Sequence, residues 1–387
     1  MRCLYNALLA PIVLLTAVAC EDKKAPADSA RADGGASTDK YATADPKLEK
    51  ALRAATSATA AANSGPPPAG VFAPGAADQR HPKGTAEKID VVSEGSDPRV
   101  LLAPGPGAGL EAMRASAYGP AILEVGMQTG PRTALPTIDL NLLLGPAKGD
   151  DTNPDTLVAD VRKAAPAKEQ LGQLPEEATQ EIASLAGTQL VVKAAAEGGP
   201  NDAQVRFGKN PAGELQRVVL RNAAEALVFS VVPLPPKPVG PGAQWIAETR
   251  MPWSGVDVIV YRAYRLKSIQ DDRLTLSLDV KAYAANSDTQ IQGVPKGATL
   301  EQFDAQAQGE VQLVRGEALA RKFDLQERVA MVFQARDVEK SPLSNDPVAA
   351  ARAPAGLPEG KMMTAQLQGQ ATLVRGGDLR AALQRRK

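Results

Sequence analysis

The segment Arg273–Ala284 alternates apolar and polar side chains along its whole length, and this pattern constrains the fold more than any other feature of the chain. The apolar positions are Leu274, Leu276, Leu278 and Val280. A period of two places them on one face of an antiparallel strand that has its other face in solvent. The segment 256–266 alternates before it, with a turn at Ile269–Asp272, so we predict a long β-hairpin.

Strand patterns dominate the rest of the body, and helical patterns are few. We predict further strands at Leu110–Tyr118, Ala121–Met127, Thr137–Leu144, Thr188–Ala195, Ala243–Arg250, Ala305–Arg315, Phe323–Phe333 and Met363–Arg375. We predict helices at Pro154–Ala165, Pro175–Leu185 and Gly213–Val232, the last ending at a proline-rich breaker. This composition of elements indicates an α+β fold that is mostly antiparallel β, with a few helices covering the sheets.

Two internal similarities suggest that the body consists of two related curved-sheet halves. Residues 305–319 and 365–379 share Ala-Gln-x-Gln-Gly followed by Leu-Val-Arg-Gly. Gly105–Ala108 recurs as Gly240–Ala243, each followed by strand patterns. The alternatives are two amphipathic strands of similar composition for the first similarity and chance for the second. On the duplication hypothesis, the halves span 86–238, which carries the helices, and 239–387.

The N-terminus has the pattern of an export signal. Arg2 precedes the apolar run Ala7–Ala19, which is too short to cross a ~30 Å hydrocarbon core that needs about 20 residues. Small residues at Ala17 and Ala19 suit a signal peptidase, and Cys20 follows directly. This arrangement resembles the lipobox of bacterial lipoproteins. The alternative is an ordinary cleaved signal that contains a cysteine.

The lipobox resemblance implies that residues 1–19 are removed and that Cys20 carries diacylglyceryl and N-acyl chains, palmitate among them. More than one acyl chain gives a stable membrane anchor. Glu21, rather than Asp, favours the outer membrane, with the body facing the periplasm or the cell surface. Residues 20–85 are rich in Ala, Pro and Gly, and we expect a disordered tether in which a helix within 46–62 would be marginal.

The composition excludes several kinds of site. Cys20 is used by the anchor, Cys3 leaves with the signal, and His81 is the single histidine, so the body has no Cys/His zinc set and no Ser-His-Asp relay. The 151–155 segment alternates oxygen side chains, but it lacks the glycine and the final glutamate of a calcium loop. We therefore expect no metal and no cofactor. The 44 basic and 44 acidic residues leave no basic excess, so we expect no nucleic-acid partner.

The phrase Pro238–Trp245 resembles a P-x-x-V-G-x-G-x-x-W stretch in bacterial lipoproteins with a duplicated β-rich domain, a family without known catalytic residues. Aromatic residues are 4% of the chain, yet five of them gather in the window 245–283. They are Trp245, Trp253, Tyr261, Tyr264 and Tyr283, with Tyr261 and Tyr264 expected on opposite faces of one strand. The functional hypothesis is an aromatic-lined cleft for an apolar or sugar-like ligand, and the alternative is an ordinary core.

These observations leave three hypotheses for function. The first is a non-enzymatic, membrane-anchored envelope lipoprotein that binds a lipid-like ligand or an envelope protein, as carriers built on curved antiparallel sheets do. The second is a structural or assembly lipoprotein that recruits partners along exposed strand edges. The third is a hydrolase that uses carboxylates alone, which would need two converging carboxylates with perturbed pKa values.

Overall fold

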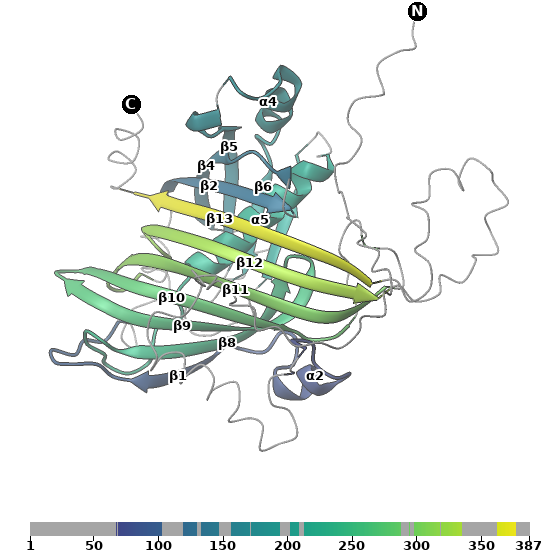
Figure 1. Cartoon of the computed structure of the whole chain (residues 1–387). Coiled ribbons are helices and arrows are strands. Elements are labelled where there is room, and N and C mark those ends of the chain that lie inside the picture. The colour runs from purple at the N-terminus through teal and green to yellow at the C-terminus, as the bar shows by residue number, and fades with distance from the viewer. Residues whose placement is uncertain are drawn as a thin grey trace, which may run out of the picture.

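The computed structural model describes residues 67, 69–102, 119–129, 133–146, 156–170, 172–193, 202–208, 213–287, 294, 298–317, 319–334 and 362–376 (Figure 1). The helices are α2 (Ala76–Arg80), the 3-10 helix η3 (Lys168–Gln170), α4 (Glu176–Ala183) and α5 (Glu214–Ser230). The strands are β1 (Lys88–Ser93), β2 (Gly119–Thr129), β3 (Thr133–Ala134), β4 (Ile138–Pro146), β5 (Thr156–Pro166), β6 (Gln189–Lys193), β7 (Asp202–Arg206), β8 (Gln244–Trp253), β9 (Val256–Gln270), β10 (Arg273–Ala284), β11 (Thr299–Val314), β12 (Lys322–Gln334) and β13 (Met362–Arg375).

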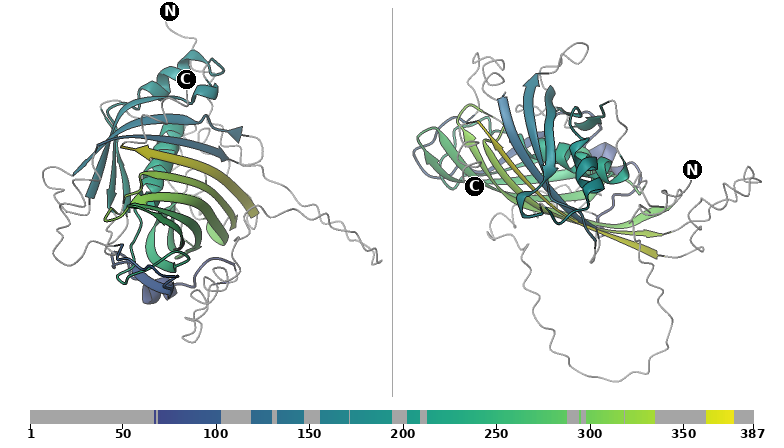
Figure 2. Two further views of the ribbon diagram at one scale, coloured as in Figure 1. Left: turned by 90° about the vertical axis from the view of Figure 1, so that its left-hand side faces the viewer. Right: turned by 90° about the horizontal axis from the view of Figure 1, so that it is seen from above.

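All of these strands belong to one antiparallel sheet, which is open and strongly curved (Figure 2). The order is β1-β8-β9-β10-β11-β12-β13-β2-β4-β5-β6-β7, with β3 paired to β2. This confirms the expected class, α+β with mostly antiparallel strands. The two predicted halves share this sheet, because β1 pairs with β8 and β13 pairs with β2.

Helix α5 lies on the concave side of the sheet and fills its interior (Figure 2). It begins after Gly213 and ends before the proline-rich 233–238 segment, as the sequence predicts. Its buried side chains, at most 4% exposed, are Val219, Leu220, Asn222, Ala223, Ala224, Glu225, Ala226, Leu227, Val228, Phe229 and Ser230. A helix that is apolar on nearly every side must be enclosed on nearly every side. The curved sheet meets that requirement by wrapping around it.

The predicted hairpin is present in β9 and β10. Leu274, Leu276, Leu278 and Val280 all face the interior, at no more than 4% exposed, while their neighbours are partly exposed. The turn is shorter than the predicted one, because Gln270 and Arg273 already pair and only Asp271 and Asp272 connect the strands.

Ordered chain extends into the segment that the sequence assigns to the disordered tether. Residues 69–85, which we call the strap, run along the outer face of the sheet and include α2. Phe72, Ala77 and His81 in the strap are 4% exposed or less. Phe72 packs edge-on against Tyr283 at 6.2 Å between ring centroids. The prediction of a tether up to residue 85 was therefore wrong at its C-terminal end, since a few well-placed apolar groups anchor an otherwise polar stretch.

The predicted helix at Pro154–Ala165 is also wrong, because this part of the chain forms β5. Thr156, Ala159, Val161 and Ala164 are buried, and β5 pairs with β4 on one side and β6 on the other. Helix propensity is a weak preference that such tertiary pairing overrides. The strand predicted at 110–118, the helix within 46–62, the 151–155 loop and Cys20 lie outside the described residues.

The repeated segments form β11 and β13, which flank β12 (Figure 1). Each ends at an Arg-Gly pair whose glycine has a left-handed backbone, Gly316 at φ 83° and Gly376 at φ 69°. The similarity thus relates two strands within the second half, and the duplication of the two halves stays a prediction. Among the described residues, we find no helix whose length and apolar character would let it cross a membrane.

Candidate functional site

The five aromatic residues of the 245–283 window do not converge on one cleft. Trp245 and Tyr264 stack inside the sheet at 5.4 Å, and Trp253 packs edge-on against Phe229 of α5 at 5.2 Å. Tyr261 and Tyr283 lie together on the outer face, 5.9 Å apart, beneath the strap. All five side chains are 7% exposed or less. Tyr261 and Tyr264 do face opposite sides of β9, so this window supplies two cores, one on each face of the sheet.

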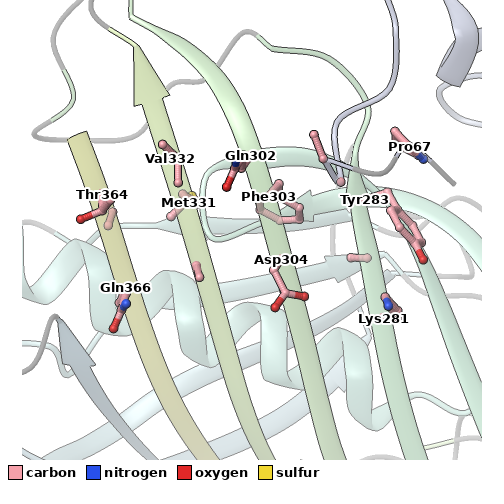
Figure 3. Close-up of a pocket in the computed structure, with 15 residues that line it drawn as sticks. Pro67, Lys281, Tyr283, Gln302, Phe303, Asp304, Met331, Val332, Thr364 and Gln366 are labelled. Carbon is pink, nitrogen blue, oxygen red and sulfur yellow. The ribbon is translucent and has the colours of Figure 1, made fainter. Parts of the chain in front are cut away.

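A hollow of about 540 Å³, which we call the outer hollow, lies where the strap meets the ends of β10–β13 (Figure 3). Its lining comes from Pro67, Ala69 and Gly70 and from residues of four strands. The strand residues are Lys281–Tyr283 on β10, Gln302–Asp304 on β11, Ala330–Val332 on β12 and Thr364–Gln366 on β13. Tyr283 is the one member of the predicted aromatic set that lines it.

Short side chains on β12 form the floor of the outer hollow. Ala330 is the cross-strand partner of both Asp304 and Gln366. Cross-strand partners in an antiparallel sheet project to the same face, so these three form a row in which the middle side chain is one methyl group. Figure 3 shows Asp304 and Gln366 on either side of this low point. Val332 stands in the same way between Gln302 and Thr364 in the next row.

The strap forms one wall of the outer hollow because it inserts between the ends of β10 and β11. The Gly70 carbonyl accepts a 2.8 Å hydrogen bond from the Ala284 N–H, and the Ala69 carbonyl accepts a 2.9 Å bond from the Phe303 N–H. Gly70 has φ +75°, and a Cβ there would lie 1.7 Å from the Phe303 oxygen. Only glycine fits this close approach of two backbones.

The described lining carries two charged side chains, Lys281 and Asp304. Lys281 Nζ lies 5.8 Å from the centre of the Tyr283 ring, a cation–π contact. Asp304 Oδ1 accepts a 2.9 Å hydrogen bond from Gln306 Nε2. Within the described part of the chain neither group forms an ion pair. The hollow therefore presents one cation and one anion in a lining that is otherwise apolar, amide or hydroxyl.

A second polar cluster lies inside the sheet, against α5. Trp253 Nε1 donates a 2.9 Å hydrogen bond to Glu327 Oε2, and the Ser254 N–H donates a 3.0 Å bond to Glu225 Oε1. Burial, followed by the charge of Glu327, raises the pKa of Glu225 well above its ordinary value. Burial also raises the pKa of Glu327. These are the converging carboxylates that a carboxylate-only hydrolase would need, but both residues are at most 6% exposed.

A third polar cluster closes the C-terminal end of α5. Arg262 donates a 3.0 Å hydrogen bond to the Val231 carbonyl and pairs with Glu87, and both of the paired side chains are 1% exposed. A cation at this end of a helix also complements the helix dipole. In the part of the chain described, the His, Cys, Asp and Glu side chains do not gather in threes that would hold a metal ion.

The sequence patterns did not predict the outer hollow, although one signal was present. The outward positions of β12 change from polar Gln326 and Arg328 to small and apolar Ala330 and Val332. The strap wall had no sequence signal, because it depends on hydrogen bonds between segments far apart in the chain.

No protein-family model, no curated protein and no solved structure matches this sequence.

Proposed function

We propose that this protein is a non-enzymatic, lipid-anchored envelope lipoprotein that binds a lipid-like ligand in the outer hollow. The observation that carries the proposal is the composite construction of the hollow, in which Pro67, Ala69 and Gly70 form a wall against four strands. Residues 21–66 separate this wall from Cys20, the proposed site of acylation. The same segment that ties the body to the membrane thus shapes the binding site.

The outer hollow suits the polar end of an amphipathic ligand better than its acyl chains. Its lining joins two charges and four amide or hydroxyl side chains, those of Tyr283, Gln302, Thr364 and Gln366, to an apolar floor. Helix α5 fills the concave interior, where acyl chains would otherwise lie. Ligand sites of this kind combine an apolar surface with a few polar groups that fix orientation.

The proposal is tested by filling the hollow. The full chain and its Ala330→Trp variant are purified from the same envelope in the same mild detergent, and the lipids extracted from each are quantified by mass spectrometry. We expect lipid near equimolar with the native chain and a marked loss in the variant, with matched circular dichroism and melting temperature. Equal lipid in both samples would mean carry-over by the detergent and would overturn the proposal. Asp324→Asn, on the same face of β12, is the control.

A second candidate function is assembly through the edges of the open sheet, and the position of β1 favours it. β1 is a terminal strand of the described sheet, and its side chains are mostly exposed, with Val92 at 45%. An extended segment of a partner protein adds to such an edge by main-chain hydrogen bonds. Val92→Lys would weaken such an interface without altering the outer hollow, so cross-linking of this variant in the envelope separates the two candidates.

Catalysis by Glu225 and Glu327 is less well supported than binding. A general acid or base must reach the substrate proton within hydrogen-bond distance. Glu225 and Glu327 instead accept hydrogen bonds from the β8–β9 turn and are covered by α5 and the sheet. We therefore assign this pair a structural role, which is to hold α5 in place inside the sheet.

A further inference from the structure

We propose that the outer hollow recognises a phosphoethanolamine-type zwitterion, with the ammonium at Asp304 and the phosphate at Lys281, as the headgroup of a membrane lipid. This inference rests on the proposed function and specifies its ligand. Lys281 and Asp304 are the charged side chains of the described lining, one of each sign. A ligand that carries both charges satisfies both groups without leaving a net charge in the site.

Lys281 and Asp304 share one face of the sheet but do not form an ion pair with each other in the part of the chain that the structure describes. Lys281 pairs across the strands with Gln306, and Asp304 lies two residues before Gln306 on β11. They are therefore diagonal neighbours on one face, a relation that places Cα atoms about 7–8 Å apart. Figure 3 shows both on the same side of the sheet. The gap between them is one that a molecule with separated opposite charges can bridge.

The environment of each group favours a primary ammonium over a quaternary one. Asp304 stands beside Gln302 on β11 and in a row with Gln366 on β13. A carboxylate and two amide oxygens can accept the three hydrogen bonds that a primary ammonium donates. A trimethylammonium group donates none. Lys281 lies on the opposite side of Asp304, free of ion pairs in the described chain, and supplies a point charge for phosphate.

The position of the hollow points to the membrane as the source of the ligand. The wall residues Pro67, Ala69 and Gly70 come directly after the segment that leads from Cys20. A headgroup bound in the hollow would touch both the strap and the sheet, and would hold the body close to the lipid surface to which Cys20 is proposed to be attached.

The first experiment tests which headgroup the outer hollow prefers. Soluble glycerophosphoethanolamine, glycerophosphocholine and glycerol 3-phosphate are titrated into the full chain in detergent by calorimetry. We expect the ethanolamine compound to bind most tightly. Asp304→Asn and Lys281→Gln should each weaken it by about two- to fivefold, the range for one partly exposed charge pair. Lys322→Gln and Asp324→Asn, an ion-paired couple at 2.9 Å on the same face of β12, are the matched controls.

The second experiment tests whether the bound headgroup belongs to a membrane lipid. The full chain is placed in nanodiscs of phosphatidylcholine alone, with phosphatidylethanolamine, or with phosphatidylglycerol, and amide hydrogen exchange is followed by mass spectrometry. We expect slower exchange at 69–72 and 302–304 with phosphatidylethanolamine only. Binding of the soluble compound without this protection would overturn the membrane source.

The outcomes also separate this inference from the function on which it rests. If Ala330→Trp abolishes lipid co-purification while Asp304→Asn and Lys281→Gln leave the headgroup preference unchanged, the hollow binds a ligand but not by its two charges. If Ala330→Trp has no effect on lipid co-purification, the proposed function fails and the inference fails with it.

Discussion

Trp253 and Glu327 are joined across the interior of the curved sheet by a 2.9 Å hydrogen bond from the indole N–H to the carboxyl group. Trp253 ends β8, and Glu327 lies in the middle of β12, four strands away in the sheet order. The contact forms because β13 carries Gly369 opposite Glu327, where a Cβ would lie 2.3 Å from Glu327 Oε1. The bond therefore ties together strands that only the curvature of the sheet brings close.

The first prediction concerns the pH dependence of stability. Because burial raises the pKa of Glu225, the folded state keeps a proton that the unfolded chain releases above about pH 4.3. The stabilisation is complete below that pH and is lost as the pH rises through the higher folded-state pKa, at about 1.4 kcal/mol for each pKa unit of difference. Glu225→Gln should flatten the decline of the unfolding free energy as the pH rises above about 4.3, the unfolded-state pKa. Urea denaturation at several pH values measures it, and an unchanged slope would contradict the prediction.

The second prediction concerns the buried pair Glu87–Arg262. Arg262→Met leaves the Glu87 carboxylate without its partner in an apolar interior, which should cost about 3–5 kcal/mol of unfolding free energy. The double variant Glu87→Leu/Arg262→Met removes both charges and should be more stable than Arg262→Met alone. Chemical denaturation of the two variants and the native chain provides the comparison. A double variant less stable than the single one would show that the charges are not the dominant factor.

The third prediction compares two glycines with the same backbone conformation. Gly70 and Gly75 have φ +75° and +77°, but a Cβ at Gly70 would meet the Phe303 oxygen at 1.7 Å, whereas a Cβ at Gly75 meets nothing within 4 Å. Gly75→Ala should cost about 1–2 kcal/mol, the ordinary strain of a left-handed residue. Gly70→Ala should cost more and should also release the strap from β10 and β11. Hydrogen exchange at 69–72, fast in Gly70→Ala and slow in Gly75→Ala, checks this.

The fourth prediction concerns acid sensitivity of the strap. Burial alone would raise the pKa of Asp257, but hydrogen bonds from Arg250 and Lys83 hold it below its ordinary value. The stabilisation by Asp257 is present above the unfolded-state pKa of about 3.9 and is lost as the pH falls through the lower folded-state value. Lys83 lies in the strap, and Arg250 also pairs with Asp78 of α2, which belongs to the strap. Protonation of Asp257 in acid should therefore loosen the strap before it affects the sheet. In Arg250→Met the strap should already be loose at neutral pH. Limited proteolysis at 76–85 over a pH series measures this, and a protected strap in that variant would contradict it.

Much of the sheet was predictable because period-two patterns record which face of a strand is buried. β10, β12 and β13 fall where the alternation predicts them, and β11 begins at Thr299, before the predicted Ala305. β5 was missed because Asn153 and Pro154 favour a helix start locally, and only pairing with β4 and β6 decides otherwise. The candidate site could not be predicted from the alternation of side chains along single strands. Its aromatic candidates Trp245 and Tyr264 are indeed buried, but on the inner face, and the outer hollow has a wall from a segment with no strand pattern.

By itself, the sequence determined that the chain forms long antiparallel strands and one strongly apolar helix, because these follow from local periodicity and from the position of proline and glycine. It also limited the chemistry, since a single histidine and two cysteines restrict the sites the chain can build. Only the tertiary structure decided that all strands join one sheet around α5, that His81 and Phe72 are packed on its outer face, and that Lys281 and Asp304 share a hollow with the strap. The physical reason is that these relations depend on burial and hydrogen bonds between residues far apart in the chain, which no local pattern records.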